Sequence, residues 1–85
     1  MFFLKWFDYT VKMTSPSLYN TVDVSIDGYV AYGVVGHYFS EGTNYFFPSL
    51  YVTSNTVYYT VREMNGNTPT SSIGLHFIVL YIKIV

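Results

Sequence analysis

The sequence contains no cysteine, so disulfide bonds cannot stabilise the fold and a structural zinc site with thiolate ligands is excluded. Charged residues are also scarce: four Lys and Arg stand against five Asp and Glu, 11% of the chain, where about 25% is typical. Because so few cations form no basic stripe, we do not expect nucleic-acid binding. The shortage of charge indicates a surface with large apolar areas, which usually mark interfaces.

At 85 residues the chain is one domain near the lower size limit for independent folding. A chain this short buries only about 60–65% of the surface that it exposes when unfolded, which leaves marginal stability. Since disulfides and thiolate zinc sites are excluded, association with other chains is the remaining means of stabilisation. We expect these partners to include further copies of the same chain.

A membrane-spanning segment is not expected. The apolar run over residues 73–82 has about ten residues, whereas a spanning helix needs about twenty. The start of the chain resembles a signal sequence only weakly, because Lys5 interrupts the apolar residues and Asp8 follows. The sequence therefore predicts no membrane partner.

Tyr, Val, Thr, Phe and Ile dominate the chain, and no stretch of helical length carries apolar residues at helical spacing. Alternation of apolar and polar residues instead predicts about six to seven short strands, typical of a small, antiparallel, jelly-roll-like β-sandwich. Asp27-Gly28 and Ser54-Asn55 are turn signals between strands, and Gly33 and Gly36 predict bulges or a bend within one. Pro48 indicates a strand end or a sheet edge. The expected strands cover residues 8–14, 20–27, 29–39, 45–47, 50–53, 56–64 and 73–85.

The last strand differs from the others because both of its faces are apolar. Leu75, Phe77, Val79 and Tyr81 lie on one face, and alternate residues from Ile78 onward lie on the other. A sandwich core can bury one face and a neighbouring subunit the other. We expect the oligomer interface to include Phe77, Ile78, Leu80, Ile82 and Ile84.

His37 and His76 are the only side chains whose ordinary pKa lies near neutral pH, so any acid–base or metal chemistry must use them. Neither has a carboxylate at short, fixed sequence spacing, and no nucleophile-elbow or phosphate-binding glycine motif is present. An enzyme would require a cleft that holds His37 or His76 beside a perturbed carboxylate. We therefore predict a non-enzymatic protein with no catalytic, cofactor-binding or metal-binding residues.

The ten tyrosines can have two roles, because tyrosine packs well on pleated sheets and also supplies rigid contact area in binding surfaces. Packing is the main expectation. Residues near loops are candidates for contact with a ligand such as a sugar, namely Tyr38, Glu41, Asn44, Tyr45, Asn65 and Asn67.

Several short segments share a pattern with a known group of proteins: Asp27-Gly28-Tyr29, Gly33-Val34-Val35-Gly36, Thr56-Val57-Tyr58-Tyr59, Val61-Arg62 and Val79-Leu80-Tyr81-Ile82-Lys83. The chain from about Tyr9 onward resembles the C-terminal domains of tail-fibre and other minor structural proteins of tailed bacteriophages. This resemblance implies a trimeric β-sandwich on a virion, with tip loops that recognise a host-surface glycan or protein.

Such domains usually follow a long shaft, whereas this chain starts at Met1 without one. We therefore expect a virion subunit such as a capsid decoration, head fibre or baseplate accessory, with itself, as a homotrimer, and other virion proteins as partners. Residues 1–8 are expected to form an aromatic attachment arm ahead of a single β-sandwich domain over residues 9–85. The arm residues are Phe2, Phe3, Trp6 and Phe7.

A carbohydrate-binding host-recognition module is the alternative function. The loops over residues 40–44 and 66–72 separate the two hypotheses. If the loops of a trimer converge with Tyr38 and Tyr45 into a concave polar pocket, the binding module is favoured. If the surface there is flat, the structural subunit is favoured.

Overall fold

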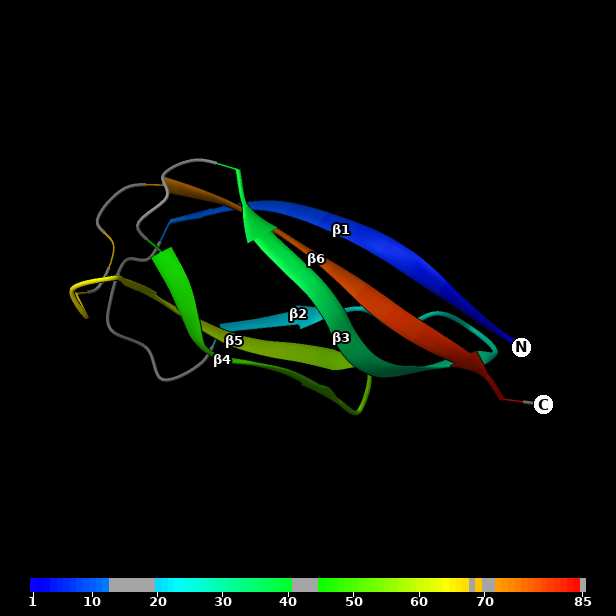
Figure 1. Ribbon diagram of the computed structural model, residues 1–85. Helices are drawn as coiled ribbons and strands as arrows, with labels where there is room; N and C mark the ends of the chain where they lie inside the picture. Colours follow the sequence, from blue (N-terminus) through cyan, green and yellow to red (C-terminus); the bar gives the residue numbers. More distant parts are fainter. Residues whose placement is uncertain (13–19, 41–44, 68, 70–71, 85) are drawn as a thin grey trace.

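The computed structural model describes residues 1–12, 20–40, 45–67, 69 and 72–84 of the chain, and these form six strands and no helix. The strands lie in two layers (Figure 1). The predicted all-β sandwich is thereby confirmed. The strands are β1 (Phe2–Lys12), β2 (Asn20–Asp23), β3 (Tyr29–Phe39), β4 (Tyr45–Thr53), β5 (Thr56–Glu63) and β6 (Ser72–Lys83).

Each layer is a three-stranded antiparallel sheet, named here after its central strand. The β6 sheet has the order β1-β6-β3, and the β5 sheet has the order β2-β5-β4. The last strand of the chain therefore lies between the first and the third, and the two ends of the chain lie side by side (Figure 1).

β1 begins at Phe2 and pairs with β6 along its whole length, from Phe2 opposite Ile82 to Lys12 opposite Ser72. The expected boundary between residues 8 and 9 falls inside this strand, so the separate attachment arm is wrong. The segment lacks the apolar–polar alternation that marks a half-exposed strand, because large apolar residues occur on both of its faces.

The core consists of alternate residues from the two central strands, which face each other between the sheets. All of these side chains are at most 3% exposed: Val57, Tyr59, Val61, Ile73, Leu75, Phe77, Val79 and Tyr81. The structure thus confirms that one face of β6 is a core face. Phe77 belongs to it at 1% exposure, so its predicted place in an oligomer interface is wrong.

Hydrogen bonds tie the two sheets together near the turn that joins β4 to β5. The Tyr81 hydroxyl donates to the Val24 carbonyl at 2.5 Å, and burial raises the pKa of Tyr81. The amide of Ala31 in β3 donates to Asn55 Oδ1 at 2.8 Å, and the amide of Val24 donates to the Asn55 carbonyl at 3.0 Å. Asn55 therefore holds both β3 and the segment after β2.

The β4–β5 turn has two residues with positive φ, Ser54 at 51° and Asn55 at 58°. Two central residues of this conformation form a type I′ turn, whose twist matches that of the flanking strands. The predicted hairpin around Ser54-Asn55 is confirmed.

Replacing Asn55 with alanine is expected to lower the free energy of unfolding by about 2–5 kcal/mol. Loss of the acceptor of the Ala31 amide costs about 1–3 kcal/mol. An alanine held at positive φ, with a Cβ but no polar side chain, costs about 1–2 kcal/mol more. Asn55→Gly loses the acceptor but tolerates the turn, so it should cost less. Urea unfolding checks the order, and an Asn55→Ala variant as stable as Asn55→Gly would contradict the role of the turn.

Two edge strands are irregular. β3 shifts register against β6 between Ala31 and Gly33 and again between Val34 and Gly36, which confirms the bulges predicted from the glycines. β4 continues through Pro48, with an irregularity between Phe46 and Ser49, because a proline at a sheet edge removes no hydrogen bond to a neighbour. The strand end considered at Pro48 is therefore wrong, and the edge position is correct.

Candidate functional site

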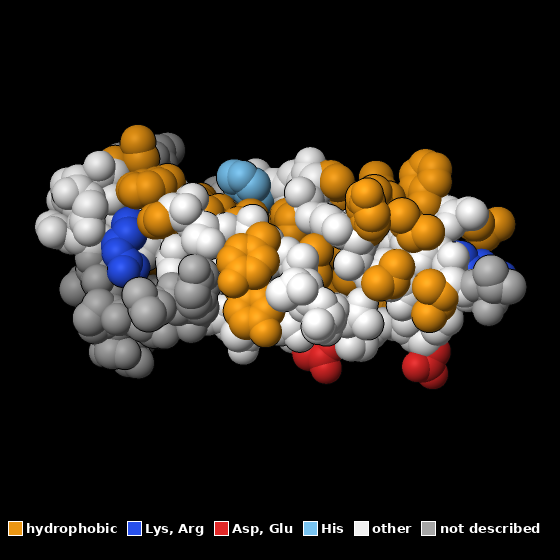
Figure 2. Space-filling model, turned by 90° about the horizontal axis from the view of Figure 1, so that it is seen from below, with side chains coloured by type: hydrophobic (Ala, Val, Ile, Leu, Met, Phe, Trp, Pro, Cys, Tyr) orange, Lys and Arg blue, Asp and Glu red, His pale blue; other side chains and the backbone are white. Residues whose placement is uncertain are grey.

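The outer face of the β5 sheet suits contact with water. Across its three strands the residues are Thr21 opposite Tyr58 and Tyr51, and Asp23 opposite Thr56 and Thr53. The rings of Tyr51 and Tyr58 stack at 5.2 Å between centroids. Figure 2 is seen from this side and shows hydrophobic side chains interrupted by polar surface, with few charges. Hydroxyl groups therefore dominate this face in place of a second apolar layer.

The outer face of the β6 sheet has the opposite character, because three consecutive rows across β1, β6 and β3 carry no polar side chain. These rows are Phe2–Ile82–Val30, Leu4–Leu80–Gly33 and Trp6–Ile78–Gly36. We call them, together with Tyr32 and Val35, the apolar outer face. Phe2 is 66% exposed, Leu4 55% and Trp6 50%, so nothing in the described chain covers them.

The bulges of β3 widen the apolar outer face. At each bulge two residues of β3 oppose one of β6, which adds Tyr32 and Val35 to the outer side. Tyr32 is 68% exposed and Val35 56%. A Cβ at Gly36 would meet the Ile78 side chain at 3.4 Å, and one at Gly33 would meet nothing within 4 Å. The apolar outer face is therefore recessed at the two glycines of β3, between large exposed side chains.

The size of the apolar outer face is that of a protein interface. A large aromatic side chain presents about 150–250 Å², so exposed aromatic and aliphatic residues of this number leave on the order of 700 Å² apolar per chain. Monomeric proteins rarely expose contiguous apolar patches larger than a few hundred Å². A standard interface buries about 800 Å² per partner. The face is thus large enough for a stable contact.

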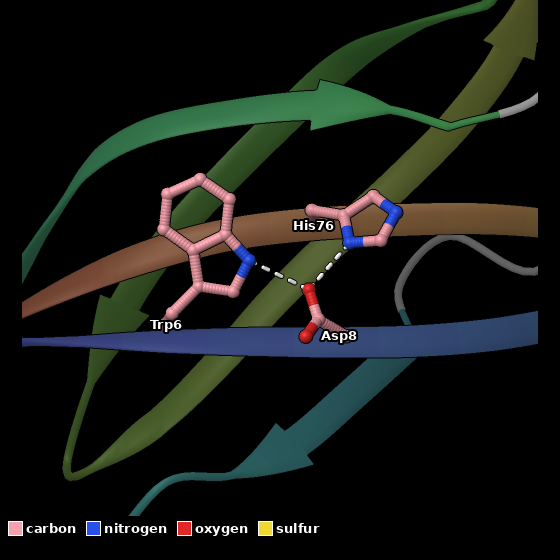
Figure 3. A network of polar contacts seen from close by, with 3 residues as sticks. All are labelled: Trp6, Asp8 and His76. Atoms are coloured by element: carbon pink, nitrogen blue, oxygen red, sulfur yellow. Dashed lines mark hydrogen bonds and ion pairs between the residues drawn. The ribbon is translucent and has the colours of Figure 1, made fainter.

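A polar cluster borders the apolar outer face in the next row, where Asp8, His76 and Tyr38 lie opposite one another. The Trp6 Nε1–H donates to Asp8 Oδ1 at 2.7 Å, and His76 Nδ1 contacts the same oxygen at 2.5 Å (Figure 3). The Tyr38 ring stacks on His76 at 4.3 Å and lies 5.7 Å from Trp6. These contacts fix both aromatic rings at the border of the apolar outer face.

Sequence reasoning missed the pair of Asp8 and His76, which lie 68 positions apart. Only the register of β1 against β6 brings them together, and no local pattern encodes that register. The hydrogen bond from His76 holds the pKa of Asp8 below its usual range, with smaller contributions from Trp6 and from the charge of His76, and desolvation opposes them. Because the Asp8 side chain is 60% exposed, water screens this interaction.

An Asp–His pair can orient a catalytic imidazole, and catalysis requires further groups beside it. His76 Nε2 is buried without a hydrogen-bond partner among the described residues. Ser40 Oγ lies over Gly74, yet no hydrogen bond joins it to His76 Nε2. His37 lies apart and meets the Phe47 ring edge-on at 5.1 Å. The contacts that the described residues of the cluster make are those that hold the Trp6 and Tyr38 rings.

Metal binding has no candidate ligand set in this part of the molecule. Among the residues that the structure describes, no three His, Asp or Glu side chains are grouped so that they could hold an ion.

The carboxyl of Asp8 is expected to titrate below the ordinary aspartate range, and His76→Leu should raise its pKa toward that range. A depressed folded-state pKa means that the carboxylate contributes stability above its unfolded pKa, and this contribution is lost as pH falls through the folded pKa. Carboxyl-carbon NMR titration measures the shift. Asp23 is an internal control, because hydrogen bonds from Ser25 lower its pKa independently. An Asp8 pKa unchanged in His76→Leu would contradict the contact.

Among the described candidate ligand residues, Tyr38 and Tyr45 lie apart in the single chain. Tyr38 lies exposed on the outer side of the β6 sheet, whereas Tyr45 packs against the core, 5.8 Å from the Phe39 ring. These two tyrosines therefore share no site within one chain, and their convergence in a trimer stays a prediction. Asn65 and Asn67 bond to each other in an exposed turn, with the Asn67 amide donating to Asn65 Oδ1 at 2.9 Å. Glu41 and Asn44 lie outside the described residues, as do residues 68, 70 and 71 of the second loop expected to separate the two functions.

The expected arm residues divide between the two faces of β1. Phe2 and Trp6 belong to the apolar outer face. Phe3 and Phe7 point inward, where Phe3 stacks on Tyr81 at 5.0 Å and Phe7 on Phe77 at 5.6 Å. Half of the predicted arm therefore completes the core.

Four of the expected interface residues lie away from the core. Ile78, Leu80 and Ile82 lie on the apolar outer face, and Ile84 follows β6 at 56% exposure.

Comparison of the chain with models of protein families, with curated proteins and with solved structures finds no match. The described part of the chain holds no helix with the length and hydropathy that crossing a bilayer requires. The apolar outer face and its polar border are therefore the observations from which a function can be argued.

Proposed function

We propose that the chain is a structural protein that self-associates through the apolar outer face, as a homo-oligomeric subunit of a tailed-bacteriophage virion. The observation that carries the self-association is that the β6 sheet is apolar on both faces, while only its inner face is covered by the β5 sheet. The sequence resemblance supports the virion setting, the other virion proteins as further partners, and three as the favoured number of copies.

A second copy fits the apolar outer face because none of the three rows carries a charged side chain. Two such faces can meet without opposing like charges and without burying an unpaired charge. The outer face of the β5 sheet is less suited, since its threonines and Asp23 would lose water on contact. Because the two outer faces of the molecule differ in this way, a specific contact is favoured over nonspecific association.

Carbohydrate binding is the second candidate function, and the polar border favours it. Trp6 and Tyr38, 50% and 46% exposed, flank the carboxylate of Asp8. Aromatic rings beside a hydrogen-bond acceptor can take the apolar face and the hydroxyl groups of a sugar. Asp8 Oδ1 already receives two hydrogen bonds, which leaves Oδ2 as the acceptor. Shifts of the Trp6 indole NMR signal on adding glycans would support this function.

Light scattering on the purified chain, from micromolar to millimolar concentration, tests the proposed self-association. We expect a mass that is a multiple of the 9.8 kDa chain and that falls on dilution. A mass of 9.8 kDa at every concentration would contradict self-association. The virion setting is tested separately by antibody labelling of purified phage particles.

A further inference from the structure

The described strands have four sheet edges, formed by β1, β2, β3 and β4. A free strand edge presents unpaired amide and carbonyl groups to any further strand, and proteins usually block it. Three of these edges carry such a block: β3 has two bulges, β4 has an irregularity with Pro48, and β2 is only four residues long.

β1 has no block of this kind. It is 11 residues long, contains neither proline nor glycine, and pairs with β6 without a register shift. Lys5 is the one charged residue on its inner side, where a charge can discourage pairing. The Lys5 Nζ lies 5.2 Å from the centroid of the Phe7 ring, so the Lys5 side chain extends along its own strand.

The backbone groups on the free edge of β1 can be assigned. The Lys83 amide donates to the Met1 carbonyl at 3.0 Å, so Met1 bonds toward β6. In an antiparallel ladder alternate residues bond to the same neighbour, so the even-numbered residues direct their amides and carbonyls outward. No backbone hydrogen bond outside the strand ladders involves them in the described chain. These residues are Phe2, Leu4, Trp6, Asp8 and Thr10.

We propose that β1 of a second copy adds to this edge in antiparallel orientation, which joins two β6 sheets into one six-stranded sheet. This inference rests on the proposed self-association and adds a second contact to it, because the edge pairing leaves the joined apolar outer face exposed for association with further copies. The pairing is symmetric about a twofold axis, so it predicts an even number of copies in place of the three that the resemblance favours.

Full overlap of the two strands fixes the register. It places Phe7 on the twofold axis and Trp6 opposite Asp8 of the second copy, so the outward groups of the two strands meet. Lys5 then lies opposite Tyr9, so no like charges are directly opposite each other; the two Asp8 residues are diagonal neighbours across the axis, each in contact with its own His76. The two apolar outer faces also become continuous, because the same even-numbered residues carry their side chains there.

Two measurements on the full chain test the pairing. In wild type, we expect the amides of Leu4, Trp6 and Asp8 to exchange with solvent slowly at concentrations where the chain is associated, and rapidly on dilution. Thr10→Pro removes an outward amide that has no role within one chain, so it should halve the mass. Thr10→Val keeps the amide and is the matched control, with wild-type mass.

The outcomes separate this inference from the proposed function. A monomer at all concentrations overturns both. A trimer, or an oligomer whose Leu4, Trp6 and Asp8 amides exchange rapidly, keeps the proposed function and overturns the β1 pairing. Since amide exchange is read on wild type, the test holds even where Thr10→Pro fails to fold.

Discussion

Replacing Phe77 with alanine is expected to lower the free energy of unfolding by about 3–5 kcal/mol. Phe77 is 1% exposed and stacks on Phe7 at 5.6 Å and on Tyr9 at 5.7 Å, so its loss leaves a cavity between β1 and the core. The total free energy of unfolding of a small domain is about 5–15 kcal/mol. The variant should therefore lose a large part of its stability, which urea unfolding measures.

Ile78→Ala is the matched control, because Ile78 is the next residue of β6 and faces the opposite way. Its side chain lies over Gly36 on the apolar outer face and is half-buried there. We expect this substitution to cost about 1 kcal/mol in the single chain, as for partly exposed residues outside a core. Equal costs for the two variants at one protein concentration would contradict the assignment of the two faces of β6.

Leu80→Lys is expected to abolish association through the apolar outer face, which leaves at most the dimer paired through β1. Leu80 is at the middle of the apolar outer face, between Leu4 of β1 and Gly33 of β3. In a single chain the lysine can extend its ammonium into water, so the fold should survive. In an interface the charge would be buried without a partner, which costs several kcal/mol.

Thr21→Lys controls for the added charge. Thr21 is exposed on the outer face of the β5 sheet, opposite Tyr58. This variant should keep the wild-type mass, because the account gives that face no role in association. Light scattering and circular dichroism on the three proteins check mass and fold together. A Leu80→Lys protein with the wild-type mass, or a Thr21→Lys protein that dissociates equally, would show that association uses another surface.

Much of the strand pattern could be predicted from the sequence because strong turn signals and regular alternation mark it. The third strand was expected at Tyr29–Phe39 and has those bounds, since Asp27-Gly28 precedes it. The hairpin at Ser54-Asn55 and the bulges at Gly33 and Gly36 follow from equally local chemistry.

The beginning of β1 could not be predicted in the same way. Phe2, Phe3, Trp6 and Phe7 are aromatic on both sides of the strand, so polar alternation is absent. A strand with two apolar faces and a free aromatic arm have the same composition. Only the pairing of β1 with β6 decides between them.

The candidate site was only half predictable. Alternation along β6 correctly separated two apolar sets and placed Phe77 with Leu75, Val79 and Tyr81. It could not tell which set faces the core, and Phe77 was wrongly included in the interface as well. The contact of Asp8 with His76 depends on which strands are neighbours and in what register, which is non-local information. A pattern read along the chain carries neither fact.

Trp6 offers the most direct test of the central claim, which is that the apolar outer face becomes covered when the chains associate. It is the only tryptophan of the chain and is 50% exposed on that face, so its fluorescence reports on the face alone. The measurement is acrylamide quenching across the concentration range in which light scattering shows the mass to rise. The account predicts that quenching weakens and emission shifts to shorter wavelength in step with the mass. A mass that rises while Trp6 stays equally accessible would contradict it.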